Sequence, residues 1–152
     1  MKKQLTIERQ SATGKLNFLS VTPFDEDHRR LEDIVGHSTW SLFKARDLGS
    51  TLALLEKHEI AVVLCERELL PGTWIDLLEH FNPLPKAPSL VVTSRLADDH
   101  LWAEALNLGA WDVLATPFNR TEVIRSVTSG WQNWHDRIHV PATTVSAMAA
   151  AS

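Results

Sequence analysis

Charged side chains stand directly after the most apolar stretch of the chain. Residues 60–64 are all apolar and rich in β-branched types, and the segment 65–68 (CERE) follows them. An uninterrupted apolar run of this kind predicts a strand covered on both faces, as in the centre of a parallel sheet. Binding and chemistry in open α/β sheets take place at the carboxyl ends of the strands. Glu66 is therefore the first candidate functional residue, and its role depends on what the other strand ends bring to it.

The other residue types that carry chemistry do not form a recognisable site. The seven histidines are scattered over different predicted elements, and none has a zinc-site spacing beside acids or a second cysteine. We therefore expect no metal site. The turn from Thr22 to Phe24 lacks the glycines that a nucleotide-phosphate loop needs. Cys65 falls inside the buried strand end, where a cysteine usually acts as a small hydrophobic residue.

Charge and composition exclude several classes of partner. The 152-residue chain has a formal net charge of −4, with 44% hydrophobic and 22% charged residues. This balance gives no reason to expect nucleic acid or an anionic membrane as the partner. The single cysteine fits a reducing compartment. The N-terminal residues are not a secretory signal, and no apolar run approaches the ~18 residues of a membrane span. We expect a cytoplasmic protein.

Short apolar segments alternate with amphipathic ones along the chain. The predicted strands are 16–21, 40–45, 60–64, 89–93 and 111–115. The predicted helices are 25–35, 50–58, 74–81, 98–108 and 120–139. An alternation that starts with a strand and has short loops requires right-handed crossovers. It predicts an α/β fold: a doubly wound, five-stranded parallel sheet with helices on both faces.

The ends of the chain differ in composition from this alternating part. We predict a flexible arm over residues 1–14, a folded domain over 15–136, and a disordered tail or linker stub over 137–152. The last helix has the strongest local signature. Asn119 is a natural N-cap, Glu122 stands three residues later as in a capping box, and the apolar stripe continues toward His139.

Several motifs match a known family. The segment 92–94 (VTS) would end the fourth strand, 106–110 (LNLGA) would close the fourth helix, and Pro117-Phe118 follows the fifth strand. Together with the order and spacing of elements over 16–134, these motifs resemble the receiver domain of bacterial two-component response regulators. The resemblance implies the flavodoxin-like receiver fold.

The resemblance also implies a set of site residues. In the family, two adjacent acids after the first strand and an aspartate after the third hold Mg²⁺, which lets that aspartate accept a phosphoryl group. A hydroxyl after the fourth strand and a lysine after the fifth bind the attached group. The matching positions here are Thr22 and Pro23 for the acidic pair, Glu66 for the phosphoacceptor, Thr93 for the hydroxyl and Thr116 for the lysine.

Of the residue types in this set, the chain has only the hydroxyl after the fourth strand, that of Thr93. Thr22 and Pro23 cannot replace two anionic oxygen ligands, and Mg²⁺ tolerates poor geometry badly. Glu66 is one methylene longer than an aspartate, and Thr116 has no charge. We therefore predict no Mg²⁺ cofactor, no enzymatic activity and a phosphorylation-independent pseudo-receiver. With no phosphoryl group to bind, Thr93 is expected to have a structural role.

Two alternatives are open at this stage. The chain would be a phosphoryl-accepting regulator of a phosphorelay if displaced acids served, with Asp25 or Glu26 as metal ligands and Glu66 or Glu68 as acceptor. It would be the input domain of a longer transcriptional regulator if an output domain followed its tail.

Glu66 itself has two readings. It would either imitate a permanently charged acceptor or be an ordinary solvated glutamate, paired with Arg67 or Arg95. We favour the solvated glutamate because a carboxylate has one charge and two oxygens, fewer than a phosphoryl group has.

The six tryptophans are the remaining unusual feature. Leu101 fits the buried stripe of its helix better than Trp102 does, so we expect Trp102 on the outside as an interface anchor. For three others we favour the core, with the interface as the alternative: Trp111, Trp131 and Trp134. In the family that the chain resembles, the face formed by the fourth helix, the fifth strand and the fifth helix docks partners or pairs receivers. We therefore expect a protein partner, namely a histidine kinase, an output domain or a second copy in a homodimer.

Overall fold

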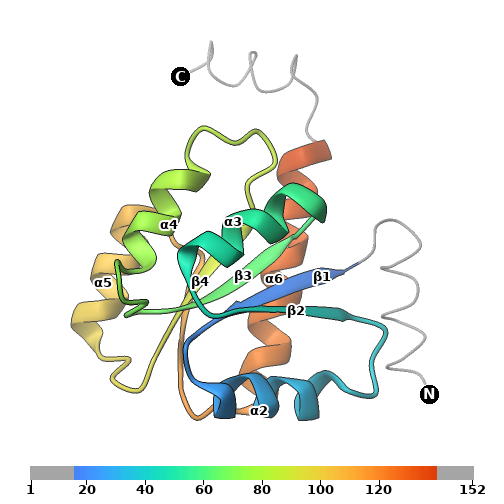
Figure 1. Ribbon diagram of the computed structural model, residues 1–152, viewed down its shortest axis with the longest axis vertical. Coiled ribbons are helices and arrows are strands. Elements are labelled where there is room, and N and C mark those ends of the chain that lie inside the picture. The colour runs from blue at the N-terminus through green and yellow to red at the C-terminus, as the bar shows by residue number, and fades with distance from the viewer. Residues whose placement is uncertain (1–15, 140–152) are drawn as a thin grey trace.

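The computed structural model describes residues 16–139, in which five strands alternate with five helices (Figure 1). The strands are β1 (Asn17–Val21), β2 (Ser41–Ala45), β3 (Val62–Glu66), β4 (Ser89–Ser94) and β5 (Asp112–Ala115). The helices are α2 (Asp25–Val35), α3 (Leu48–Lys57), α4 (Trp74–Phe81), α5 (Asp99–Leu108) and α6 (Arg120–His139). The order of elements is the predicted one.

All five strands belong to one parallel sheet in the order β2-β1-β3-β4-β5. The chain runs from β1 outward to β2, crosses back to β3 and then continues to β4 and β5. This is the predicted doubly wound topology. The direction of winding reverses between β1 and β3, so the carboxyl ends of these two strands are where such a sheet opens a crevice.

The central strand β3 differs from its predicted range. It spans Val62–Glu66 rather than 60–64, although Ile60 is also buried. Glu66 is paired with Thr93 of β4, and the N–H group of Arg67 donates to the carbonyl of Thr93 over 2.9 Å. Backbone pairing requires only N–H and C=O groups, so the ladder continues past the point where the apolar side chains stop.

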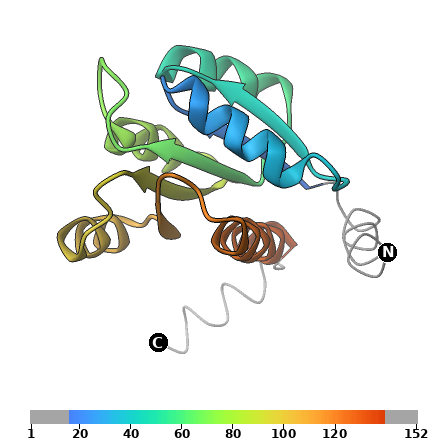
Figure 2. The same ribbon diagram turned by 90° about the horizontal axis from the view of Figure 1, so that it is seen from below.

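Helices cover both faces of the sheet, and each face has its own hydrophobic cluster. Residues of α2 and α6 pack on one face, whereas residues of α3, α4 and α5 pack on the other. Figure 2 shows α6 nearly along its axis, below the sheet. The two faces alternate along β3: Val62 and Leu64 belong to the α2/α6 cluster, and Val63 and Cys65 to the opposite one.

The helix ends follow local sequence signals in most cases. Asn119 caps α6 because its side-chain oxygen accepts the N–H group of Glu122 over 3.1 Å. Gly109 ends α5 with a positive φ of 107°. Gly36 ends α2 in a right-handed conformation instead, so no left-handed cap forms there. The helix α6 ends at His139, as its apolar stripe predicts.

The predicted arm 1–14 lies outside the described residues, as does the predicted tail 137–152 from residue 140 on. Residues 137–139 of that predicted tail belong to α6, so the predicted boundary at 136 is too early. No helix within residues 16–139 is long and apolar enough to cross a membrane.

Candidate functional site at the carboxyl edge of the sheet

Four predicted positions lie at one edge of the sheet. Thr22 follows β1, Glu66 ends β3, Thr93 lies near the end of β4, and Thr116 follows β5. Glu66 and Thr93 are register partners on neighbouring strands. Side chains alternate along a strand, so Glu66, two residues after Leu64, faces the side covered by α2 and α6. The fold therefore brings together the positions that the resemblance singles out.

Glu66 is buried, which corrects the prediction of a solvated glutamate. Its side chain is 5% exposed, and its Oε2 accepts the N–H group of Glu68 over 2.9 Å. Within residues 16–139 it forms no ion pair, so neither Arg67 nor Arg95 is a direct partner. Burial raises the pKa of Glu66 above the usual glutamate value.

A second buried acid, Asp27, lies close to Glu66. It belongs to the first turn of α2 and is 5% exposed. Burial raises the pKa of Asp27, and the negative charge of Asp27 adds to the increase in the pKa of Glu66. Sequence reasoning missed Asp27, yet a signal was present. Asp27 lies four residues before Leu31 and so continues the buried stripe of the helix.

Arg95 is the arginine whose positive charge acts on both of these acids. It follows β4, pairs with Glu26, and places its guanidinium 4.8 Å from the centre of the Phe24 ring. The positive charge of Arg95 offsets part of the effect of burial on the pKa of Asp27 and of Glu66, and both pKa values stay raised. The cation of this site therefore enters from the end of β4, whereas Thr116 at the end of β5 supplies none.

The two candidate metal ligands of the displaced-acid alternative form exposed ion pairs. Asp25 is exposed and pairs with Arg46, whose guanidinium also donates to the carbonyl of Pro23 over 2.8 Å. Glu26 is exposed and pairs with Arg95.

The remaining positions are buried and neutral. The hydroxyl of Thr22 accepts the N–H group of Phe24 over 3.1 Å, and its carbonyl accepts the Nε2–H of His28 over 3.1 Å. Burial lowers the pKa of His28, so the imidazole resists protonation. Thr93 is 2% exposed. The Oγ1 of Thr116 is buried and has no hydrogen-bond partner among the described residues.

These residues do not fit the Mg²⁺ ion that receiver domains use. The site offers two buried carboxyl groups, those of Asp27 and Glu66, where the family has three acids. Among residues 16–139 there is no group of three or more His, Cys, Asp or Glu side chains that could hold a metal ion. Mg²⁺ requires charged oxygen ligands in near-octahedral geometry, which this arrangement does not supply.

The tryptophans separate into two groups. Trp131 and Trp134 are each 3% exposed and belong to the α2/α6 cluster, so they are core residues and not interface anchors. Trp102 is 36% exposed, as expected from the helix pattern. Trp111 is 39% exposed, so its predicted core position is wrong. It immediately precedes β5, an edge strand of the sheet.

Comparisons with known proteins agree on the fold. Neither a protein-family model nor a curated protein matches the sequence. The chain is similar to the solved signal receiver domain of an HD domain-containing protein from Pseudomonas fluorescens Pf-5. The identity is 21%, the TM-score is 0.73, and the match covers 83% of this chain and 94% of that one.

Two further receiver domains have the same fold. One belongs to Saccharomyces cerevisiae Ssk1 and was solved with the phosphotransfer protein Ypd1, with 15% identity, a TM-score of 0.68 and coverage of 76% of this chain and 88% of that one. The other is the NtrC4 receiver domain, solved as a beryllofluoride-activated dimer, with 13% identity, a TM-score of 0.70 and coverage of 78% and 98%. The chain therefore has the fold of response regulator receiver domains.

Proposed function

We propose that this chain is a receiver-like signalling domain of a two-component system, and that it acts through protein contacts without being phosphorylated. The observation that carries the proposal is the chemistry at the carboxyl edge of the sheet. Glu66 is buried beside Asp27, and Thr22 and Thr116 are neutral. The fold of a receiver is thus combined with a site that lacks the charges of phosphoryl transfer.

Burial works directly against a nucleophilic role for Glu66. A carboxyl group must be ionised to attack a phosphoryl group, and a raised pKa favours the protonated form. Ionisation of Glu66 would also add a negative charge that acts on Asp27, while the positive charge of Arg95 offsets only part of the effect of burial on both acids. Without a bound cation, an incoming phosphoryl group would meet net negative charge.

The contact surface that we propose is centred on α5. Trp102 and Leu106 are separated by four residues, so they share one face of the helix. Trp102 is 36% exposed and Leu106 48% exposed. Large exposed apolar side chains of this kind are typical anchors of protein interfaces. The simplest occupant is a second copy of this chain, since the NtrC4 receiver domain was solved as a dimer.

The phosphorelay alternative now depends on Asp27. The ion pairs of Asp25 and Glu26 with arginines leave Asp27 as the acid that accompanies Glu66. One unpartnered oxygen of Asp27, Oδ2, is the feature that favours this alternative. The weakness of this alternative is the number of charged groups. The family has three acids and a lysine at these positions, whereas this site has two carboxyl groups and no lysine.

One experiment separates the two functions. The protein is incubated with Mg²⁺ and either acetyl phosphate or beryllofluoride, while tryptophan fluorescence and intact mass are recorded. We expect no saturable change in fluorescence and no added phosphoryl mass. A Mg²⁺-dependent response that is lost in Glu66→Gln but kept in Glu79→Gln would refute the proposal and support the phosphorelay. Glu79 is an exposed glutamate on α4, so its exchange controls for a simple loss of charge.

A further inference from the structure

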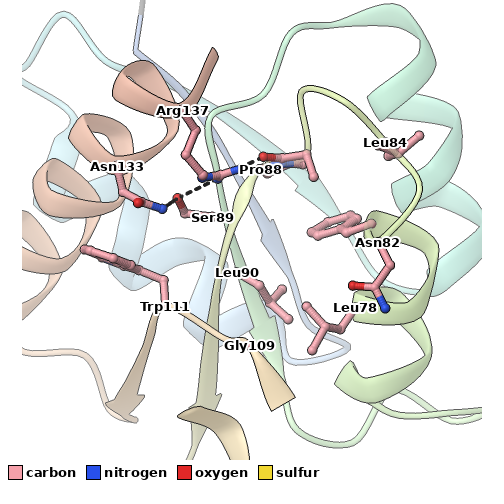
Figure 3. A pocket seen from close by; sticks show the side chains of 12 residues that line it. Leu78, Asn82, Leu84, Pro88, Ser89, Leu90, Gly109, Trp111, Asn133 and Arg137 are labelled. Carbon is pink, nitrogen blue, oxygen red and sulfur yellow. Dashed lines mark hydrogen bonds between the residues drawn. The ribbon is translucent and has the colours of Figure 1, made fainter. Parts of the chain in front are cut away.

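A pocket of about 380 Å³ lies at the edge of the sheet opposite the predicted site. It is bounded by α4 and the loop after it, by the start of β4, by the residue before β5, and by the last turns of α6 (Figure 3). Small-molecule pockets in proteins usually measure about 300–1,000 Å³, so this volume suffices for a compact ligand.

One side of the pocket is apolar and held in place. Leu78 and Leu90 line it, together with the ring of Trp111. The indole Nε1–H of Trp111 donates to the hydroxyl of Ser129 over 3.0 Å. Gly130 allows the ring to lie close to α6, because a Cβ atom there would be 3.4 Å from Cδ1 of Trp111. The apolar wall is therefore formed before any ligand enters.

The other side is polar, and three side chains are connected there by the dashed bonds of Figure 3. The buried hydroxyl of Ser89 donates to the carbonyl of Gly130 over 2.8 Å. It accepts Nδ2–H of Asn133 over 3.0 Å and an Nη2–H of Arg137 over 3.4 Å. A hydroxyl has one donor and two acceptor positions, so Ser89 is saturated and serves to position the other two.

Arg137 retains donors that no described residue uses. Its Nη2 also donates to the carbonyl of Ala87 over 3.1 Å, whereas Nε and Nη1 make no hydrogen bond within residues 16–139. No carboxylate of these residues lies within ion-pair distance of its guanidinium. Arg137 is exposed, and partial desolvation lowers its pKa. By contrast, Arg125 of α6 forms an ion pair with Asp112.

We propose that this pocket binds a small organic carboxylate with an apolar body. The carboxylate pairs with the free donors of Arg137, whose planar fork matches two carboxylate oxygens. The body lies against Leu78, Leu90 and Trp111. This site is independent of the proposed function, because it lies at the amino ends of β4 and β5 and uses none of the residues near Glu66.

The test is a titration of the full chain followed by two-dimensional NMR. Phenylacetate is the probe, and phenylacetamide is the matched compound without the charge. We expect phenylacetate to cause saturable shifts of the Trp111 indole N–H and of the Ser89 and Asn133 amides. Phenylacetamide should bind at least tenfold more weakly. Inorganic phosphate, which lacks the apolar body, should also bind at least tenfold more weakly.

Variants then test whether Arg137 supplies the positive charge that binds the carboxylate. Arg137→Gln should weaken phenylacetate binding at least tenfold and leave phenylacetamide binding unchanged, while Arg137→Lys should have an intermediate effect because it keeps the charge but loses the fork. Arg29→Gln removes an exposed arginine from α2 and should change nothing. Circular dichroism verifies that each variant is folded.

The proposal is overturned by equal affinity for phenylacetate and phenylacetamide, by phosphate binding as strong as phenylacetate binding, or by unchanged binding in Arg137→Gln. Nuclear Overhauser contacts between the pocket and residues 140–152 in the ligand-free protein would also overturn it, because the chain itself would then occupy the site.

Discussion

Asp27 and Glu66 are two buried acids brought together at the carboxyl edge of the sheet, and the charge of Asp27 raises the pKa of Glu66. One residue comes from the first turn of a helix and the other from the end of the central strand. In an active receiver, charge in this region would be needed for metal binding and phosphoryl transfer. Here burial raises the pKa of both carboxyls, which supports the proposal of a receiver-like domain that is not phosphorylated.

The first prediction concerns the pH dependence of stability. The pKa of Glu66 is higher in the folded protein than in the unfolded chain, so between these two values the folded state binds more protons. The stabilising contribution is therefore complete below the unfolded pKa and is lost as pH rises through the folded pKa. Glutamine does not ionise, so the stability of Glu66→Gln should not fall for this reason as the pH rises. Its amide oxygen can still accept the N–H group of Glu68.

The stability of Glu66→Gln relative to wild type should therefore rise as the pH increases above the unfolded pKa of glutamate, and level off above the folded pKa of Glu66. Urea unfolding at several pH values measures the difference, and Glu79→Gln should show no comparable trend. A constant difference across this range would mean that Glu66 is not desolvated.

The second prediction concerns Arg95. Its positive charge opposes the effect of burial on Asp27 and Glu66, so Arg95→Gln should raise the pKa of both carboxyls further. Carbon-detected NMR of the side-chain carboxyls follows the two titrations. The change in stability from losing the exposed pair with Glu26 should be less than about 1 kcal/mol.

A matched control is available in Arg46, which also forms an exposed ion pair, with Asp25. Arg46→Gln should leave both buried pKa values as they are. If both arginine variants shifted them equally, the effect would come from net charge and not from the position of Arg95.

The third prediction tests the contact surface on α5. Trp102→Ala and Leu106→Ser should each weaken self-association at least tenfold, measured by sedimentation equilibrium, and change the stability of the monomer by less than about 1 kcal/mol. Leu70→Asn is the control, because Leu70 is exposed in the loop before α4 and has a positive φ that asparagine tolerates. Unchanged association in both α5 variants would remove this face as the interface.

The fourth prediction concerns Gly130 of α6. A Cβ atom there would be 3.1 Å from Cγ2 of Val62, which is fully buried in the central strand, and 3.4 Å from Trp111. Gly130→Ala gains about 1 kcal/mol of helix propensity but overpacks this contact, at a cost of about 1–3 kcal/mol. We expect a net loss of about 1 kcal/mol in urea unfolding and altered emission from Trp111. A more stable variant would show that Val62 and α6 can move apart freely.

Local and periodic signals were sufficient to predict most of the fold. Strands and helices alternate in the predicted order, Asn119 caps α6, and Gly109 closes α5 in the left-handed conformation that glycine favours. Cys65 is buried, as its place in an apolar run indicates. These features depend on residues within a few positions of one another, which is why they can be read from a single sequence.

The residue types at the strand ends are given directly by the sequence. Thr22, Pro23 and Thr116 stand where the family has charged groups, and a residue type does not depend on folding. The prediction that they hold no Mg²⁺ could therefore be made from the sequence and the resemblance, and it stays a prediction.

The environment of these groups depended instead on contacts between distant segments. Three consecutive acids begin α2, and packing against the sheet buries Asp27 while leaving Asp25 and Glu26 to pair with arginines. Glu66 is buried at the end of the central strand, where it pairs with Thr93 of β4, although its charge indicated solvent. Trp111 is exposed because it precedes an edge strand, and Arg137 reaches β4 across 48 residues of chain. Such placements arise from long-range packing, which the composition of a local segment does not encode.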